Sequence, residues 1–182
     1  MENKEITSET LQSEHSCTLL TDFTDTTMNQ RWRTVNDKVM GGKSEGGAVF
    51  QDGTMIFSGR INTNGGGFSS VRFDLQDESL TSFTHLKLKV RTQDFDREYR
   101  IIIEDKNRGT VVYRTPLKLK DSPEWQEVLI PFDAFKPSRR GEPISEPAFD
   151  KNKAASVGIM LNDTPDGAFK LELDIIEVCE KE

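Results

Sequence analysis

Residues 85–91 read HLKLKVR, and this short stretch indicates the fold class. Leu86, Leu88 and Val90 alternate with basic residues, so the apolar side chains point to one face of an extended chain and the charged ones to the other. A strand with one buried and one solvated face is typical of an antiparallel sheet. Residues 169–175 repeat the pattern, and their expected buried face carries Phe169, Leu171, Leu173 and Ile175.

Similar alternation recurs along the chain, and turn signals rich in glycine, proline and aspartate separate the runs. Short strands at this regular spacing predict an all-β protein, an antiparallel β-sandwich. One helical turn is expected at residues 132–135, after Pro131. The expected strands cover roughly residues 17–21, 46–51, 54–62, 67–75, 84–92, 98–105, 109–117, 125–130, 155–162 and 168–178.

The length and charge of the chain narrow its class. Residues 1–16 are polar and aperiodic, which predicts a disordered tail, and residues 17–180 are expected to form one domain. The net charge of −7 disfavours non-specific binding to nucleic acid, because that binding depends on neutralising phosphates. No apolar run reaches the length of about 18 residues that a membrane span needs. Since the N-terminus also lacks a secretory signal, a cytoplasmic location is expected.

The two cysteines, Cys17 and Cys179, lie near opposite ends of the chain. A disulfide between them would join the two ends of the domain, which often lie close together. The favoured interpretation is a pair of free thiols in a reducing compartment. Neither cysteine belongs to a Cys/His cluster, so no metal site is expected.

A first glycine-containing segment, residues 36–44, reads NDKVMGGKS. Its adjacent glycines permit backbone angles or close approaches that a Cβ atom would forbid. Asp37 and Ser44 can accept hydrogen bonds from backbone amides of the turn, and Met40 can act as an apolar plug. A rigid, buried Ω-type loop that closes one end of the sandwich is the favoured interpretation, and a ligand-binding loop is the alternative. The spacing of GGKS excludes a Walker-type phosphate loop.

A second segment, residues 62–70, reads NTNGGGFSS and leads into an expected strand. The favoured interpretation is a wide connection in which Phe68 anchors the core. The alternative is a set of exposed backbone amides at the rim of a cleft. No helix is expected after these glycines, which excludes a dinucleotide-binding fingerprint.

Basic residues occupy the polar faces of several expected strands. If these strands are neighbours, they form a basic surface that could attract an acidic partner. The favoured alternative is a solvated face on which the cations alternate with Asp and Glu. The residues concerned are Arg72, Lys87, Lys89, Arg91 and Arg100.

The sequence offers little for catalysis. His15 and His85 have no nucleophile or carboxylate at a recognisable spacing. A hydrolase with a carboxylate pair stays open as a third hypothesis, because acidic residues are plentiful. Cofactor fingerprints are absent, so no cofactor is expected. Residues 136–153 form a connection too long for a hairpin, and such connections are usually functional or packed as a cover.

Four segments, in this order, resemble the CIA30 family, which is named for the complex I intermediate-associated protein of mitochondria. Residues 32–44 resemble its W…(N)DxVMGGxS signature, and residues 57–72 its FxG…NxGGFxSVR segment. Residues 125–141 resemble its W…PF…F…(R)G stretch, and residues 157–171 its closing pair of strands. One departure is the segment TQDFDREY at residues 92–99, where the family often has a Gly-Asp-Gly turn, which puts a binding role of that loop in doubt.

The resemblance implies a galactose-binding-like jelly roll, similar to some carbohydrate-binding modules, in what looks like a bacterial member. It also implies a non-catalytic, protein-binding assembly or chaperone-like factor, with a respiratory or membrane complex as the partner. A carbohydrate- or small-ligand-binding module is the alternative. Asp37 and Arg72 are expected to lie close enough to pair. The candidate binding residues are Trp32, Asp37, Met40, Gly41, Gly42, Ser44, Gly66, Gly67, Phe68 and Arg72.

Overall fold

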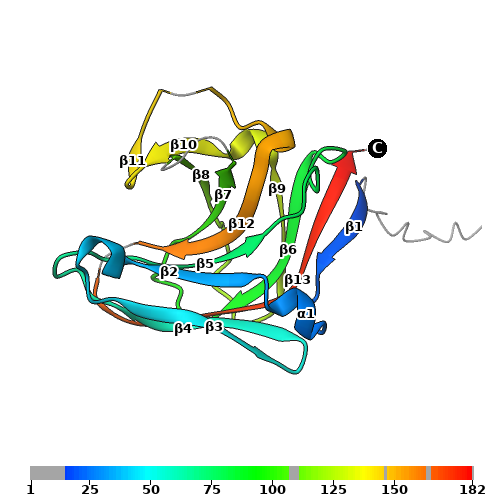
Figure 1. Cartoon of the computed structure of the whole chain (residues 1–182). Coiled ribbons are helices and arrows are strands. Elements are labelled where there is room, and N and C mark those ends of the chain that lie inside the picture. Colours follow the sequence, from blue (N-terminus) through cyan, green and yellow to red (C-terminus); the bar gives the residue numbers. More distant parts are fainter. Residues whose placement is uncertain (1–14, 107–110, 146, 163–164, 182) are drawn as a thin grey trace, which may run out of the picture.

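The computed structural model describes residues 15–106, 111–145, 147–162 and 165–181, and it confirms the predicted β-sandwich (Figure 1). The short helices are α1 (Thr26–Asn29), η1 (Asp37–Met40), η2 (Phe132–Ala134) and η3 (Lys151–Lys153). The strands are β1 (His15–Thr21), β2 (Trp32–Asn36), β3 (Glu45–Gln51), β4 (Thr54–Ile61), β5 (Ser69–Asp74), β6 (His85–Thr92), β7 (Tyr99–Asp105), β8 (Val111–Pro116), β9 (Gln126–Pro131), β10 (Lys136–Arg139), β11 (Glu142–Pro143), β12 (Ala154–Leu161) and β13 (Gly167–Lys181).

The strands form two antiparallel sheets. The six-stranded sheet has the order β3-β4-β13-β6-β9, with β1 also paired to β13, and the seven-stranded sheet has the order β11-β10-β8-β7-β12-β5-β2. Apolar residues from both sheets fill the space between them. Leu86, Leu88 and Val90 have no exposed surface, which confirms the alternation that indicated the fold. None of the described helices is long and apolar enough to cross a membrane.

The long strand β13 departs from the predicted alternation at a bulge. Its register with β6 shifts between Leu173 and Ile175. A bulge adds one residue to one strand and so reverses the faces of the residues that follow. Ile176, which is 1% exposed, therefore enters the core, while Ile175 is only partly buried. The prediction that Ile175 shares the face of Leu173 was wrong for this reason.

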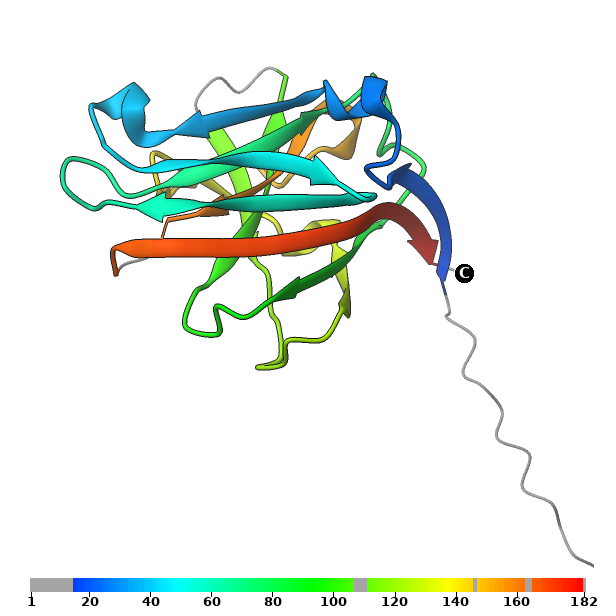
Figure 2. The ribbon, with the colours of Figure 1, turned by 90° about the horizontal axis from the view of Figure 1, so that it is seen from below.

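Strand β1 places the two cysteines together. It pairs with the C-terminal half of β13 (Figure 2), and the register of the two strands places Cys17 directly opposite Cys179. The two residues form a disulfide, with their Cα atoms 4.1 Å apart. The favoured interpretation of free thiols was therefore wrong, since it rested on the expected compartment and not on the position of β1. Of the predicted tail, residues 1–14 lie outside the described residues, and β1 begins at His15.

The five basic residues considered above do not form one surface. Lys87, Lys89 and Arg91 lie on β6 of the six-stranded sheet, whereas Arg72 and Arg100 lie on the other sheet. The cations of β6 pair with carboxylates of neighbouring strands, chiefly Glu177, Asp174 and Glu172 of β13. The interpretation of a solvated face with alternating charges therefore holds for β6, and a basic cluster is left only on the seven-stranded sheet.

Candidate functional site

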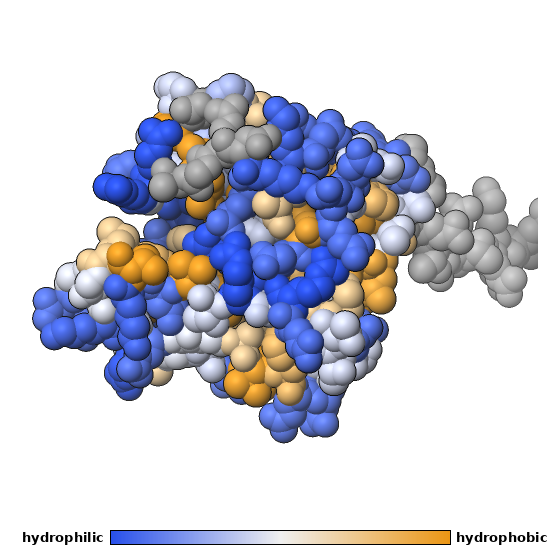
Figure 3. Space-filling model, viewed as in Figure 1, coloured by the Kyte–Doolittle hydropathy of each residue, from blue (hydrophilic) through white to orange (hydrophobic). Residues whose placement is uncertain are grey.

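A groove of about 800 Å³ crosses the face of the seven-stranded sheet that points away from the core. One rim consists of η1 and residues 66–68, and the other consists of β10 and the turn that follows it. In Figure 3, apolar residues gather at the η1 end of the molecule and hydrophilic ones at the β10–β11 end. The lining comprises Val35, Val39, Met40, Gly66, Gly67, Phe68, Arg72, Glu104, Val112, Arg114, Ser138, Arg140, Gly141, Met160 and Asn162.

The rim at η1 is held by Asp37, whose side chain is completely buried. Its Oδ1 accepts a hydrogen bond from the backbone N–H of Ser44 at 2.9 Å. Its Oδ2 accepts from the backbone N–H groups of Gly67, at 2.7 Å, and Phe68, at 3.3 Å. One carboxylate therefore joins the two glycine-containing segments.

Two glycines make this close contact possible. A Cβ atom on Gly42 would lie 2.3 Å from Cγ of Asp37, and one on Gly66 would lie 2.5 Å from its Oδ2. Gly41 and Gly67 have φ angles of +81° and +137°, which other residues rarely adopt. The glycines of both segments therefore have a structural role, as the sequence favoured. Two details of that interpretation were wrong, because residues 36–44 leave Met40 58% exposed and do not form a buried loop, and because Phe68 lines the groove and does not anchor the core. This role coexists with the position of Met40, Gly66 and Gly67 in the lining of the groove.

The electrostatics of Asp37 follow from its surroundings. Burial raises the pKa of this carboxyl group, but the hydrogen bonds from Ser44, Gly67 and Phe68 outweigh burial and hold the pKa below its usual value. Asp37 is therefore ionised at neutral pH. We call the hydrogen bonds from Ser44, Gly67 and Phe68 to the Asp37 carboxylate the clasp. Ser44 extends the clasp, because its hydroxyl accepts a hydrogen bond from the N–H of Asn62 at 2.9 Å.

Arg72 pairs with Glu104 and not with Asp37. Its Nη1 lies 2.7 Å from Oε2 of Glu104, whereas Asp37 is saturated by the amides of its own clasp. The predicted pairing of Asp37 with Arg72 was therefore wrong. Glycine at position 158 of β12 lets β5 approach closely, since a Cβ atom there would lie 2.4 Å from the backbone oxygen of Val71 and 3.0 Å from Cγ of Arg72.

Glu104 is the centre of this network. It also binds Arg33, at 2.5 Å, and the hydroxyl of Ser156, at 2.5 Å. Burial raises the pKa of Glu104, but Ser156 and the two arginines more than compensate and lower it. Glu104 is the sole carboxylate that lines the groove within the described part of the chain. Its negative charge is balanced by Arg72 and Arg33. The groove therefore gives no support to a hydrolase with a pair of converging carboxylates.

Arg114 differs from Arg72 in its partners. Within the described residues, no carboxylate lies within ion-pair distance of Arg114, and its guanidinium donates to the backbone oxygen of Gly141 at 2.5 Å. Partial burial and, next, the nearby cation Arg100 lower the pKa of Arg114, while the carboxylate of Glu142 acts in the opposite direction without outweighing them. Arg100 itself pairs with Glu98 at 2.8 Å. The β8 side of the groove therefore holds positive charge that Glu142 compensates only from beyond ion-pair distance.

The structure separates nine of the ten candidate binding residues into two groups. Met40, Gly66, Gly67, Phe68 and Arg72 line the groove, while Asp37, Gly41, Gly42 and Ser44 support its rim from below. Trp32 does neither, because it packs against Phe23 and Phe73. Whether these residues bind a partner stays a prediction. Sequence reasoning missed the opposite wall, although the alternation of β7 and β8 placed Glu104, Val112 and Arg114 on polar faces.

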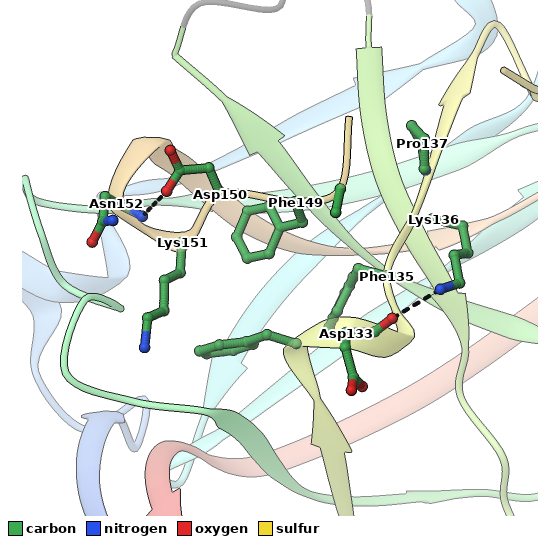
Figure 4. A pocket seen from close by; sticks show the side chains of 10 residues that line it. Asp133, Phe135, Lys136, Pro137, Phe149, Asp150, Lys151 and Asn152 are labelled. Carbon is green, nitrogen blue, oxygen red and sulfur yellow. Dashed lines mark hydrogen bonds between the residues drawn. The ribbon is translucent and has the colours of Figure 1, made fainter. Parts of the chain in front are cut away.

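A second cavity, of about 690 Å³, lies beside the long connection of residues 136–153 (Figure 4). The ring of Phe149 enters it and packs against Tyr113, Phe132 and Phe135. Lys136 and Asp150 bind backbone atoms close by in the chain, the oxygen of Asp133 and the N–H of Asn152. The connection is thus a packed cover, one of the two roles that its length predicted.

A third cavity adjoins the loop in which the chain departs from the CIA30 pattern. Asp94 orders this loop, because its carboxylate accepts hydrogen bonds from the hydroxyl of Tyr99 at 3.1 Å and the N–H of Lys170 at 2.5 Å. Phe95, which is 47% exposed, lies in the wall of the cavity. Asp94 therefore anchors the altered turn to β7 and β13.

A model of the complex I intermediate-associated protein 30 (CIA30) family matches residues 21–173. The chain belongs to the CIA30 family. The chain is 32% identical over 151 residues to a probable mitochondrial complex I intermediate-associated protein 30 of Caenorhabditis briggsae, covering 69% of this chain and 43% of that protein. It is 29% identical over 174 residues to an uncharacterised protein of Schizosaccharomyces pombe, covering 84% of this chain and 79% of that one. The CIA30 chain thus spans less than half the length of the Caenorhabditis relative.

Solved structures show the fold of this CIA30 domain among carbohydrate-binding modules. A family 11 module from a cellulosomal cellulase of Clostridium thermocellum aligns with a TM-score of 0.65 at 18% identity, over 90% of this chain and 94% of that one. A xylan-binding module aligns with a TM-score of 0.53 at 14% identity, over 85% and 94%. At these identities the likeness shows the β-sandwich jelly roll alone.

Proposed function

We propose that this CIA30 domain is a non-catalytic binding module that holds a protein partner during the assembly of a larger complex, with respiratory complex I as the first candidate. The family match over residues 21–173 supports an assembly role. The observation that carries the proposal is the exposed apolar rim of the groove. Val39 is 74% exposed and Met40 is 58% exposed, on a turn that Asp37 fixes in place.

The composition of the groove fits a protein partner. Methionine and arginine are enriched at protein interfaces relative to the rest of the surface. Here Met40 and Met160 lie in one groove with Arg72 and Arg114. A turn that is rigid before binding loses little conformational entropy when a partner docks, so more of the contact energy contributes to affinity.

A sugar platform has less support. Stacking on a sugar ring needs exposed aromatic side chains. The tryptophan and tyrosine residues of the chain are Trp32, Tyr99, Tyr113 and Trp125. Tyr99 and Tyr113 are buried at 1% and 0% exposure, and none of the four lines the groove. Trp125 lies on the other sheet, where Arg91 stacks on its ring at 4.5 Å. Phe68 is the one aromatic residue among those described in the groove lining, so the carbohydrate alternative rests on the fold and this single ring.

The test is affinity purification of the tagged chain from its own cells, with mass spectrometry of the eluate. We expect subunits of complex I, or of its assembly intermediates, to be enriched with the wild type and depleted with Met40→Ser. Val49→Ser is the matched control, because Val49 of β3 is 57% exposed on the other sheet. An eluate indistinguishable from that of the tag alone would contradict the proposal.

A further inference from the structure

We propose that the groove recognises an acidic segment of its protein partner, whose carboxylates pair with Arg114 and Arg140 and whose apolar side chain packs against Val39 and Met40. The inference rests on the proposed function and deepens it, since it assigns the chemistry of the bound segment. Two features of the described residues support it: the excess of positive charge and the position of the apolar rim.

The charges in the groove are unbalanced on an acidic protein. The chain carries a net charge of −7, yet the lining holds Arg72, Arg114 and Arg140 against Glu104. Glu104 is engaged by Arg72 and Arg33, so it offers nothing to Arg114. A partner carboxylate at Arg114 would relieve the repulsion between Arg114 and Arg100, and bidentate pairing with a guanidinium is favourable in a partly buried site.

The apolar rim lies across the groove from this charge. Val39 and Met40 belong to η1, whereas Arg114 belongs to β8 and Arg140 follows β10. A free anion, such as phosphate, would use the arginines and leave the apolar rim unoccupied. A polypeptide segment with both carboxylates and an apolar side chain can satisfy the two rims together, which favours it as the occupant.

The experiment uses a library of displayed random peptides, selected on the full chain. We expect the enriched peptides to combine Asp or Glu with an apolar residue. Binding of a labelled enriched peptide, followed by fluorescence anisotropy, is expected to weaken about tenfold with Arg114→Gln or Met40→Ser, as for a central contact at an interface. Binding is also expected to weaken as the salt concentration rises.

Matched controls come from the other sheet. Arg91→Gln removes a guanidinium that pairs with Glu172, and Val49→Ser removes an exposed apolar side chain, so neither variant is expected to change the affinity. Circular dichroism checks that all four variants fold. Enrichment of neutral or basic peptides, a lack of saturable binding, or equal losses with the control variants would overturn the inference.

The two proposals can fail separately. Capture of complex I subunits that depends on Met40, together with selected peptides that are not acidic, would leave the assembly role intact and reject the acidic segment. Acidic peptides that require Arg114, together with an eluate that contains no complex I subunits, would establish the chemistry of the groove and reject the assembly role.

Discussion

Asp37 holds the turn at η1 with a single buried carboxylate. Its oxygens accept from three backbone amides of two segments, which lie 7 and about 30 residues further along the chain. Hydrogen bonds to an ionised acceptor are stronger than neutral ones. The turn that exposes Val39 and Met40 is therefore rigid because of a buried residue beneath it.

Replacing Asp37 with Asn should destabilise the domain by about 3 kcal/mol at pH 7. The amide carries no charge, and its NH2 group would face backbone N–H groups that need an acceptor. The folded pKa of Asp37 lies below its unfolded value, so its stabilisation is present above the unfolded pKa and is lost as the pH falls through the folded one. The difference between wild type and Asp37→Asn should therefore narrow below about pH 4. Urea unfolding at several pH values measures it.

The control for this experiment is Asp121→Asn, because Asp121 is exposed. It should change the free energy of unfolding by less than about 0.5 kcal/mol at any pH. A difference between wild type and Asp37→Asn that stayed constant down to pH 3 would contradict the assignment of a depressed pKa to Asp37.

Replacing Gly66 with Ala should lower the free energy of unfolding by about 2 kcal/mol, because the new methyl group would overlap Oδ2 of Asp37. The matched control is Gly47→Ala on β3, where the added atom would meet Oγ1 of Thr34 at an ordinary 3.4 Å. Thermal and urea unfolding of both variants measure the difference. Equal stability of the two variants would show that the clasp accommodates the added methyl group without loss of stability.

At the level of elements, the disulfide between β1 and β13 closes a loop with a sequence separation of 162. Such a cross-link stabilises mainly by restricting the unfolded chain, by up to about 5 kcal/mol in the chain-entropy model. Reduction should therefore lower the urea midpoint without changing the native far-ultraviolet circular dichroism. The double variant Cys17→Ser, Cys179→Ser should be as stable as the reduced wild type and insensitive to reductant. A midpoint that reductant leaves unchanged in the wild type would argue against the cross-link.

Elements with a strict period of two could be predicted from the sequence, and the less regular ones could not. Strand β2 has five residues, and none of them is completely buried. Its sequence therefore shows little alternation of apolar and polar residues from which a strand could be predicted. Strand β10 includes Pro137, which usually marks a strand edge or an interruption. The bulge in β13 is set by its pairing with β6, and the alternation of residue types does not show it.

For the whole molecule, the family and the jelly roll followed from the order of four motifs, while the groove followed only in part. The glycine-containing rim could be predicted, because close approach of two backbones requires glycine and a cluster of glycines is visible in the sequence. The wall of Val112, Arg114 and Ser138 could not, because it depends on β8 lying between β7 and β10. Strand order is decided by packing across the sandwich, and local alternation does not encode it.

The covalent link between β1 and β13 also bears on how the domain responds to force. Cys17 and Cys179 lie near the two ends of the described chain, and their strands are direct neighbours (Figure 2). Tension applied to the chain outside this pair passes through the sulfur atoms and bypasses the two sheets. A translocase or unfoldase that threads a single strand would therefore stall on the oxidised domain and proceed once a reductant has opened the link. The redox state of one bond would then decide whether the folded domain can be pulled apart mechanically.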